Sequence, residues 1–507
     1  MSPSPSPGSQ HVGPSRRQFL RRGARAAAGL TLAPAVLAAA GCGPQAVVTS
    51  AAGPATHTLR ARRFRAAPDG REREVWGYDG QLPGPVIRAR EGETLRVKVV
   101  NELGTPTSVH WHGMHQPGTW QMDGVEGVSA PPIPTGSEFV YEFRAEPAGT
   151  HWYHSHVGVQ YGNGLFGPLI IEERQPIAAY GREEILLIND WFLELGDVLL
   201  DHLVKGDGMK MDMKPGQKTD EAKGPAPGRM GDKKDVGDIP FQSVLFNGKG
   251  RAPGGTKSPL AALEVKKGET IRLRLINGSS TYALRFQIDG HPLTVIASDG
   301  MPVRPLTVDD LVLGIGERFD VLLKADQDGA FWIRAATLDG NEGLAVLRYA
   351  GSQRPEPEPS PVRWGPRSLA PDQLRSPEQV RLPKEGVREV PLRLGGSMKP
   401  YRWSINDKFF PEADPIGLKK DEWARFVLDN PTGMDHPFHL HGHSFYVLGK
   451  PGALNVADPP LKDTTNVPAK ESLVIQWQAD NPGKWFFHCH IEWHLATGMA
   501  RVVEIQA

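Results

Sequence analysis

One segment recurs three times along the chain and limits the folds that the chain can adopt. Residues 91–101 read EGETLRVKVVN, residues 267–277 read KGETIRLRLIN, and residues 420–430 read KDEWARFVLDN. Each copy is a charged turn followed by alternating apolar and polar residues, the pattern of a strand with one buried face. A second segment recurs in the same order, as GTHWY at 149–153, GAFWI at 329–333 and GKWFF at 483–487. The repetition predicts an all-β chain of three tandem β-sandwich domains with Greek-key connections.

Composition places the boundaries between these repeats. We expect the first domain at residues 54–175, the second at 176–350 and the third at 386–507. Residues 351–385 are predicted to be a proline-rich linker, because the segment from Gly351 through Pro371 contains six prolines. Residues 201–238 contain no Phe, Trp or Tyr but much Lys, Asp and Gly, so we expect a long mobile loop inside repeat two.

Residues 1–42 have the pattern of an export leader. Arg16 and Arg17 are followed by Phe-Leu and by an Ala- and Leu-rich run from residue 26 to residue 40, an order that resembles a twin-arginine leader. This predicts a periplasmic or extracellular protein that is exported already folded. The sequence AAGC at 39–42 is an imperfect lipidation motif, so lipid anchoring at Cys42 and simple cleavage nearby both remain open. Attachment to a membrane is expected only if Cys42 is lipidated.

Charge argues against a nucleic-acid partner. The formal net charge of the whole chain is zero, and the five arginines of the leader account for the only basic excess.

Histidines in repeats one and three form four His-X-His pairs. On a strand, residues i and i+2 point to the same face, so each pair presents two imidazoles to one space. Repeat two has lost these residues: Phe286, Ile288 and the run Arg334-Ala335-Ala336 stand at the matching positions. The shared space should therefore lie between repeats one and three. The eight histidines are His110, His112, His154, His156, His439, His441, His488 and His490.

Cys489 lies between two of these histidines and should point to the opposite face. Its natural companions there are His436, His494 and Met499, which occur only in repeat three. Two imidazoles, a thiolate and a distant thioether are the ligands of a blue-copper electron-transfer site. Zinc also accepts sulfur and imidazole, but Met is a poor zinc ligand, and eight imidazoles without a carboxylate favour a copper cluster over iron or magnesium.

These motifs together resemble those of the multicopper oxidases, the group of laccases and copper-resistance oxidases. The motifs are HWHG at 110–113, HSH at 154–156, HPFHLHG at 436–442 and HCHIEWH at 488–494 with Met499. The resemblance covers nearly all of the chain after the leader, and it implies three cupredoxin-like domains and four copper ions. It implies a type 2 copper on His110 and His439, and a type 3 pair on His112, His154, His156, His441, His488 and His490. It also implies a type 1 copper on His436, Cys489 and His494, with Met499 as the axial ligand.

The same resemblance suggests how protons and electrons move. Asp123 matches an acid that orients water on the type 2 copper and supplies protons, although a solvated loop carboxylate is the alternative interpretation. Leu495 stands where some bacterial members carry a second acid. We expect Cys489 to relay electrons, and His494 or His436 to present the imidazole edge at which electrons enter.

Other candidate ligands are weaker. His115, His151, His291 and His443 lack a partner at metal-binding spacing and are expected to be hydrogen-bonded structural residues. Within the predicted loop, His202, Met209, Met211 and Met213, with Met230 farther on, are either incidental or soft ligands for Cu(I).

The sequence therefore predicts an oxidase that couples four one-electron oxidations to the reduction of O2 to water. Phenols and aromatic amines are the expected reductants, as in laccases, and oxidation of Cu(I) for copper tolerance is the alternative. A non-enzymatic copper-binding scaffold is disfavoured because the ligand set is complete. A copper nitrite reductase is also disfavoured, because it would not need His488 and His490 as a pair.

Overall fold

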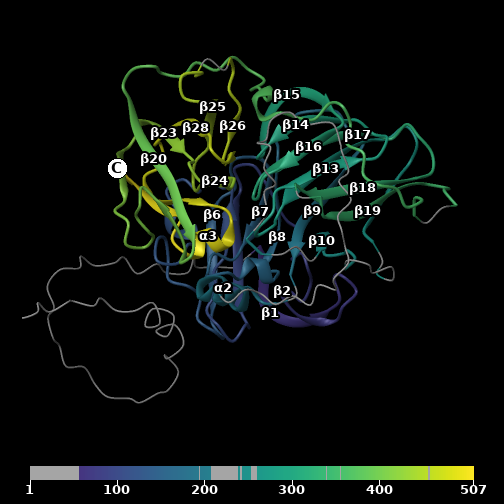
Figure 1. Cartoon of the computed structure of the whole chain (residues 1–507), viewed down its shortest axis with the longest axis horizontal. Helices are drawn as coiled ribbons and strands as arrows, with labels where there is room; N and C mark the ends of the chain where they lie inside the picture. The colour runs from purple at the N-terminus through teal and green to yellow at the C-terminus, as the bar shows by residue number, and fades with distance from the viewer. Residues whose placement is uncertain are drawn as a thin grey trace, which may run out of the picture. The chain divides into compact units, whose positions relative to one another are not determined.

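A computed structural model describes residues 56–192, 194–206, 238–239, 243–252, 258, 260–338, 340–353, 356–454 and 457–507. In these residues the strands form six sheets, two for each repeat (Figure 1). The prediction of an all-β chain of three sandwich domains is confirmed. None of the helices in the described residues is both long and apolar enough to cross a membrane.

Repeat one consists of two four-stranded sheets. The first has the order β2-β1-β4-β6, formed by β1 (His57–Ala66), β2 (Arg73–Tyr78), β4 (Thr94–Asn101) and β6 (Glu138–Arg144). The second has the order β3-β8-β7-β5, formed by β3 (Ile87–Arg90), β5 (His110–His112), β7 (Gly149–His154) and β8 (Phe166–Glu172). Two short 3-10 helices, η1 (Trp120–Met122) and η2 (Tyr161–Asn163), lie in its connections.

Repeat two has a six-stranded and a five-stranded sheet. The larger has the order β10-β9-β12-β17-β14-β15, formed by β9 (Arg182–Trp191), β10 (Ser243–Phe246), β12 (Thr270–Asn277), β14 (Leu293–Ser298), β15 (Met301–Val308) and β17 (Arg318–Lys324). The smaller has the order β11-β19-β18-β13-β16, formed by β11 (Ala262–Val265), β13 (Leu284–Ile288), β16 (Asp310–Leu313), β18 (Ala330–Thr337) and β19 (Glu342–Tyr349).

Repeat three has the same two sheet sizes. The larger has the order β21-β20-β23-β28-β25-β26, formed by β20 (Val387–Met398), β21 (Tyr401–Ile405), β23 (Trp423–Asp429), β25 (Phe445–Gly449), β26 (Leu461–Lys462) and β28 (Ser472–Gln478). The smaller has the order β22-β30-β29-β24-β27, formed by β22 (Ile416–Lys419), β24 (His436–Leu440), β27 (Thr464–Val467), β29 (Gly483–Cys489) and β30 (Ala500–Gln506). Helix α3 (Glu492–Ala496) joins β29 to β30, and the 3-10 helix η3 (Pro371–Gln373) lies in the proline-rich linker.

The recurring segment forms an equivalent strand in every repeat. β4, β12 and β23 each pair in parallel with one neighbour and antiparallel with the other. Burial alternates along β4 and β23, as the sequence predicts, but β12 is buried at nearly every position. Arg272 and Arg274 cause this difference: both are buried, and both pair with Asp320 and with glutamates from outside the strand.

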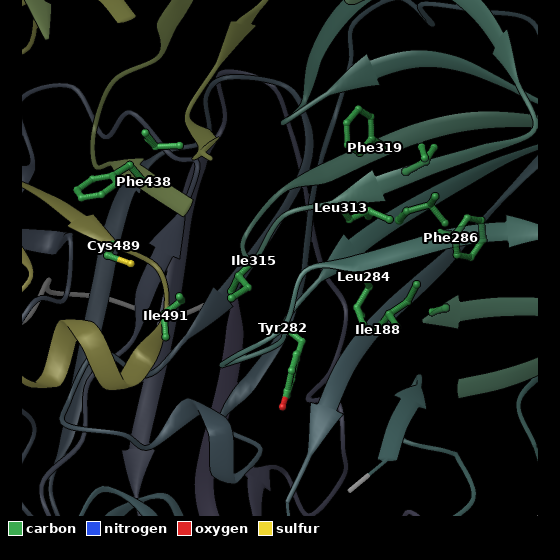
Figure 2. Packing of buried hydrophobic residues seen from close by; sticks show 14 of the residues in the cluster. Ile188, Tyr282, Leu284, Phe286, Leu313, Ile315, Phe319, Phe438, Cys489 and Ile491 are labelled. Atoms are coloured by element: carbon green, nitrogen blue, oxygen red, sulfur yellow. The ribbon is translucent and has the colours of Figure 1, made fainter. Parts of the chain in front are cut away.

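The largest hydrophobic cluster runs without interruption through repeats two and three. It contains Leu284, Phe286 and Ile315 of repeat two together with Cys489 and Ile491 of repeat three. Figure 2 shows Ile315 beyond Leu313, on the side toward Cys489 and Ile491. Repeat one has a cluster of its own around Trp111 and Tyr153. Repeats two and three are therefore joined by a shared apolar core.

The predicted mobile loop at 201–238 is wrong at both of its ends. Residues 201–205 belong to helix α2 (Gly196–Lys205), which ends at Gly206 in the left-handed conformation. Leu199 is buried and Leu203 is half-buried against the core, so the apolar residues at helical spacing outweigh the polar composition. Asp238 is also placed, in the site described below. Met209, Met211, Met213 and Met230 lie outside the described residues.

Candidate metal centres

The strands bring the four histidine pairs to the seam between repeats one and three. His110 and His112 form β5 with Trp111, and β7 sets His154 directly across from His110. In repeat three, β24 sets His439 directly across from His488 of β29. The other three histidines, His156, His441 and His490, come just beyond the ends of these strands. Each pair still shares one space, as expected, because the two rings of a pair lie 4.8 to 5.9 Å apart.

The two closest ring pairs in this cluster cross between repeats one and three. The ring centroids of His110 and His441 are 3.8 Å apart, and those of His112 and His439 are 3.7 Å apart. Within repeat three, the Nε2 atoms of His441 and His488 approach to 3.0 Å. The prediction that the eight imidazoles meet at the interface of repeats one and three is confirmed in the structure.

Repeat two places no ligand at the equivalent strands. Phe286 and Ile288 belong to the hydrophobic core, and Arg334 pairs with Asp289 and Glu342. The spacing of the repeats predicts Arg334 across from Phe286, but the structure places Ala335 there, one position later.

Nitrogen atoms in the cluster are arranged as a metal requires. His110, His154, His439 and His488 each place Nδ1 within 3.0 Å of a backbone carbonyl oxygen, which fixes Nδ1 as the protonated donor. Within the described residues, the Nε2 atoms of His110, His154, His156 and His439 are buried and have no hydrogen-bond partner. Unpaired buried lone pairs that converge on one space are costly unless an ion accepts them. The residues therefore fit a bound metal cluster.

Burial also keeps these imidazoles neutral. Loss of hydration, reinforced by the neighbouring imidazoles, holds the pKa well below its usual range for His112, His154, His156, His441, His488 and His490. A neutral imidazole keeps the lone pair that a metal needs.

Asp123 bridges the two halves of the cluster. Its Oδ1 lies 3.1 Å from His110 Nδ1, and its Oδ2 lies 2.8 Å from His441 Nδ1. The side chain is fully buried, so the alternative of a solvated loop carboxylate is wrong. One carboxylate thus orients an imidazole from repeat one and an imidazole from repeat three.

A second group of ligands surrounds Cys489 on the opposite face of β29. Its Sγ lies 3.7 Å from His436 Nδ1 and 3.6 Å from His494 Nδ1, and these two nitrogens are 3.2 Å apart. Met499 is buried, and its carbonyl oxygen accepts the Cys489 N–H at 3.1 Å. Thiolate, imidazole and thioether together suit copper.

Neither His436 nor His494 exposes an imidazole edge, which corrects the expectation from sequence. His494 Nε2–H donates to Asp238 Oδ2 at 2.7 Å, and Tyr401 donates its hydroxyl to the same oxygen. Trp403 stacks on the His494 ring with centroids 3.9 Å apart. His436 Nε2 lies 2.8 Å from Thr432 Oγ1. Residues distant in sequence therefore cover the His494 imidazole, whereas the end of the His436 imidazole is covered by Thr432, four residues before it.

Sequence reasoning missed Asp238 and two further acids near the cluster. Asp463 places Oδ1 3.3 Å from His112 Nε2, and its backbone oxygen lies 2.9 Å from His439 Nδ1. Burial raises its pKa, but the Arg318 guanidinium outweighs that effect and holds the pKa of Asp463 well below its usual range. Glu492 lines a small cavity with His154, His156 and Leu495. No spacing distinguishes Asp238 or Asp463, because His494 and His112 come from other repeats. Glu492 lies two residues after His490, inside the HCHIEWH motif, so the sequence did carry a signal for it.

The remaining histidines are hydrogen-bonded, as predicted. His115 bonds to the Ser444 hydroxyl, His151 and His443 bond to backbone carbonyls, and His291 bonds to the Tyr349 hydroxyl. None of them belongs to a candidate metal group among the described residues. His202 lies on α2, 3.8 Å from Glu194.

Comparison with known proteins agrees with this geometry. Three multicopper oxidase family models match residues 61–176, 183–352 and 387–507. The multicopper oxidase MmcO of Mycobacterium tuberculosis is 33% identical to this chain, and the match covers 96% of this chain and 95% of that protein. The chain belongs to the multicopper oxidase family.

Solved multicopper oxidases have the same fold. The laccase of Botrytis aclada superposes with a TM-score of 0.74 at 29% identity, covering 92% of this chain and 93% of that one. Fet3p, described as a multicopper oxidase that functions in iron import, gives a TM-score of 0.75 at 25% identity, covering 89% and 90%. This multicopper oxidase is a copper-dependent, laccase-like oxidoreductase that oxidises a reducing substrate with O2.

Replacing Cys489 with serine tests the second ligand group. We expect Cys489→Ser to remove one copper per chain and the blue thiolate absorption, while the histidine cluster keeps its copper, because the thiolate faces away from that cluster. Metal analysis and visible spectroscopy measure both effects. Cys489→Ser protein with full copper content and full turnover would contradict the assignment.

Proposed function

We propose that this protein is a laccase-type oxidase with four copper ions, three in the histidine cluster and one beside Cys489. The observation that carries the proposal is the position of Cys489. Its side chain belongs to one ligand group, while its neighbours His488 and His490 belong to the other. The backbone of residues 488–490 would therefore connect the site of electron uptake to the site of O2 reduction.

The ligands divide among the coppers as the family resemblance implies. His436, Cys489, His494 and the axial Met499 would hold the type 1 copper, and His110 with His439 the type 2 copper. Bound copper supplies one-electron acceptance at the first group and four-electron reduction of O2 to water at the cluster. The type 3 pair would be held by His112, His154, His156, His441, His488 and His490.

Asp123 is the proposed proton-managing residue of the cluster. Its two oxygens face His110 and His441, so the carboxylate lies beside the space in which water forms. Because it is buried, its charge acts in a low dielectric and is felt strongly by both imidazoles.

Phenols and aromatic amines are the proposed reductants. The His494 ring packs against the aromatic rings of Tyr401 and Trp403, and these rings suit an aromatic donor that transfers its electron without binding the metal. The Asp238 carboxylate beside them can accept the proton that a phenol loses on oxidation. The laccase of Botrytis aclada, similar over most of the chain, supports the same substrate class.

Oxidation of Cu(I) is the second candidate. The same Asp238 carboxylate favours a cation next to His494. The methionines that would strengthen this alternative lie outside the described residues.

Oxygen consumption by the copper-loaded protein separates these two substrates. We expect a higher kcat/KM for a simple diphenol than for Cu(I) in the same buffer, because the covered imidazole is flanked by aromatic rings. A preference for Cu(I) would make the protein a cuprous oxidase. No oxygen uptake with either donor would refute the oxidase assignment itself.

Substitution of Asp123 tests its role in O2 reduction. We expect Asp123→Asn to slow reoxidation of the reduced protein by O2 about 10- to 100-fold, because the amide cannot carry the charge or the proton, and to leave the blue absorption unchanged. Stopped-flow absorbance measures the rate. The control is Asp310→Asn, a buried aspartate paired with Arg285 in repeat two, which should reoxidise normally. Equal rates in the two variants would remove Asp123 from the mechanism.

We also propose export by the twin-arginine route to the periplasm or the exterior. The support is the pattern of residues 1–42, which lie outside the described residues. Replacing Arg16 and Arg17 with lysine should leave the protein inside the cell, as measured by fractionation and immunoblotting. Unchanged export of that variant would contradict the route, and labelling with a radioactive fatty acid decides between lipidation at Cys42 and cleavage.

A further inference from the structure

Repeat two contributes no histidine to the cluster, yet one of its turns reaches it. The turn at residues 314–317 joins β16 to β17. Its Gly316 N–H donates to the Asn277 carbonyl of β12 at 2.9 Å, and its Glu317 carbonyl accepts the Asn277 N–H at 3.1 Å. Within the turn, Ile315 is buried in the core shared with repeat three (Figure 2). The next residue, Gly316, therefore has little freedom to move.

Gly316 packs its backbone against two of the imidazoles. A methyl group added at its Cα would lie 2.9 Å from His490 Cδ2 and 3.1 Å from His112 Cε1. These histidines come from repeats three and one, and His490 Nε2 lies 3.3 Å from His112 Nδ1. Gly316 also has a φ of +83°, a conformation that favours glycine. The turn closes the cluster where the two repeats meet.

Arg318, the first residue of β17, reaches His112 and His439 through Asp463. The buried guanidinium donates from Nη1 to Asp463 Oδ1 at 2.7 Å and from Nη2 to Oδ2 at 2.6 Å. Its Nε donates to the Thr150 carbonyl of repeat one at 3.0 Å. Asp463 in turn contacts His112 and His439. Arg318 thus ties all three repeats to one carboxylate beside the cluster.

Asp299 fixes the register of this arrangement. Its Oδ1 accepts the Arg318 backbone N–H at 2.9 Å, and its Oδ2 accepts the Thr464 N–H at 3.2 Å. Lys462 places Nζ 3.0 Å from the same carboxylate. Thr464 Oγ1 lies 3.1 Å from His112 Nε2. These hydrogen bonds and the Lys462–Asp299 ion pair therefore join repeats two and three next to His112.

We propose that Gly316 and Arg318 of repeat two are positioning residues for the histidine cluster. Gly316 sets the separation of His112 and His490, and Arg318 holds Asp463 in the place that orients His112 and His439. This inference rests on the proposed assignment of the eight histidines to a three-copper cluster. It explains what a repeat without ligands contributes to O2 reduction.

The test compares Gly316→Ala with Gly268→Ala in the full-length, copper-loaded protein. Gly268 is also a turn glycine of repeat two, with a φ of +92°, but an added methyl would meet nothing within 4 Å. Both variants carry the same kind of backbone strain, and only one touches imidazoles. Copper content by metal analysis, the electron paramagnetic resonance signal of the type 2 copper and the blue absorption are measured on each.

We expect Gly316→Ala to lose at least one of the three cluster coppers and to keep the blue absorption, while Gly268→Ala keeps all four coppers. Equal copper content in the two variants would overturn the proposal, as would a parallel loss of blue absorption and cluster copper in Gly316→Ala. A wild-type protein with no type 2 signal would instead refute the proposed function.

Arg318→Lys provides the second arm if Gly316→Ala does not fold. Lysine keeps the charge but cannot form the two-pronged bond to Asp463. We expect an altered type 2 resonance signal, because His439 loses its fixed orientation, with the blue absorption intact. A type 2 signal identical to that of the wild type would overturn the role of Arg318.

Discussion

Eight imidazoles from two repeats converge on one buried space, and the rest of the structure is arranged around that convergence. Several of their nitrogen lone pairs are buried without a partner in the described residues, a condition that a folded chain avoids unless a ligand satisfies it. The burial that creates this demand also lowers the pKa of most of these histidines, so the lone pairs remain available at neutral pH. Burial of the histidines on folding therefore produces both the unpaired nitrogen atoms and the low pKa values.

Carboxylates and carbonyls around the cluster fix the orientation of its imidazole rings. Asp123 orients one imidazole of each histidine-bearing repeat, and Asp463 does the same from the other side with His112 and His439. A metal site needs such outer partners, because ring orientation decides which nitrogen faces the ion. The two buried acids come from different repeats, so the cluster is complete only when the domains are packed together.

The convergence of the histidine pairs could be predicted because they combine a strict local spacing with strand geometry. His-X-His on a strand points two rings to one face, and Cys489 between two histidines must point to the other. Helix α2 could not be predicted in the same way, since its few apolar residues were outweighed by polar neighbours in composition. The exposure of His494 was also predicted wrongly, because Asp238, Tyr401 and Trp403 are separated from it by tens to hundreds of residues.

The three-fold repetition, the absence of the histidine pairs from repeat two and the candidate ligands in repeats one and three were all readable in the sequence. These follow from periodicity and residue type, which are local properties of the chain. Packing between distant segments places Asp238 over His494, Asp463 beside the histidine cluster, and Gly316 and Arg318 of repeat two next to it. Those contacts join segments that lie far apart in the sequence, and no sequence pattern indicates that they meet. Side-chain packing between domains depends on shape and charge in three dimensions.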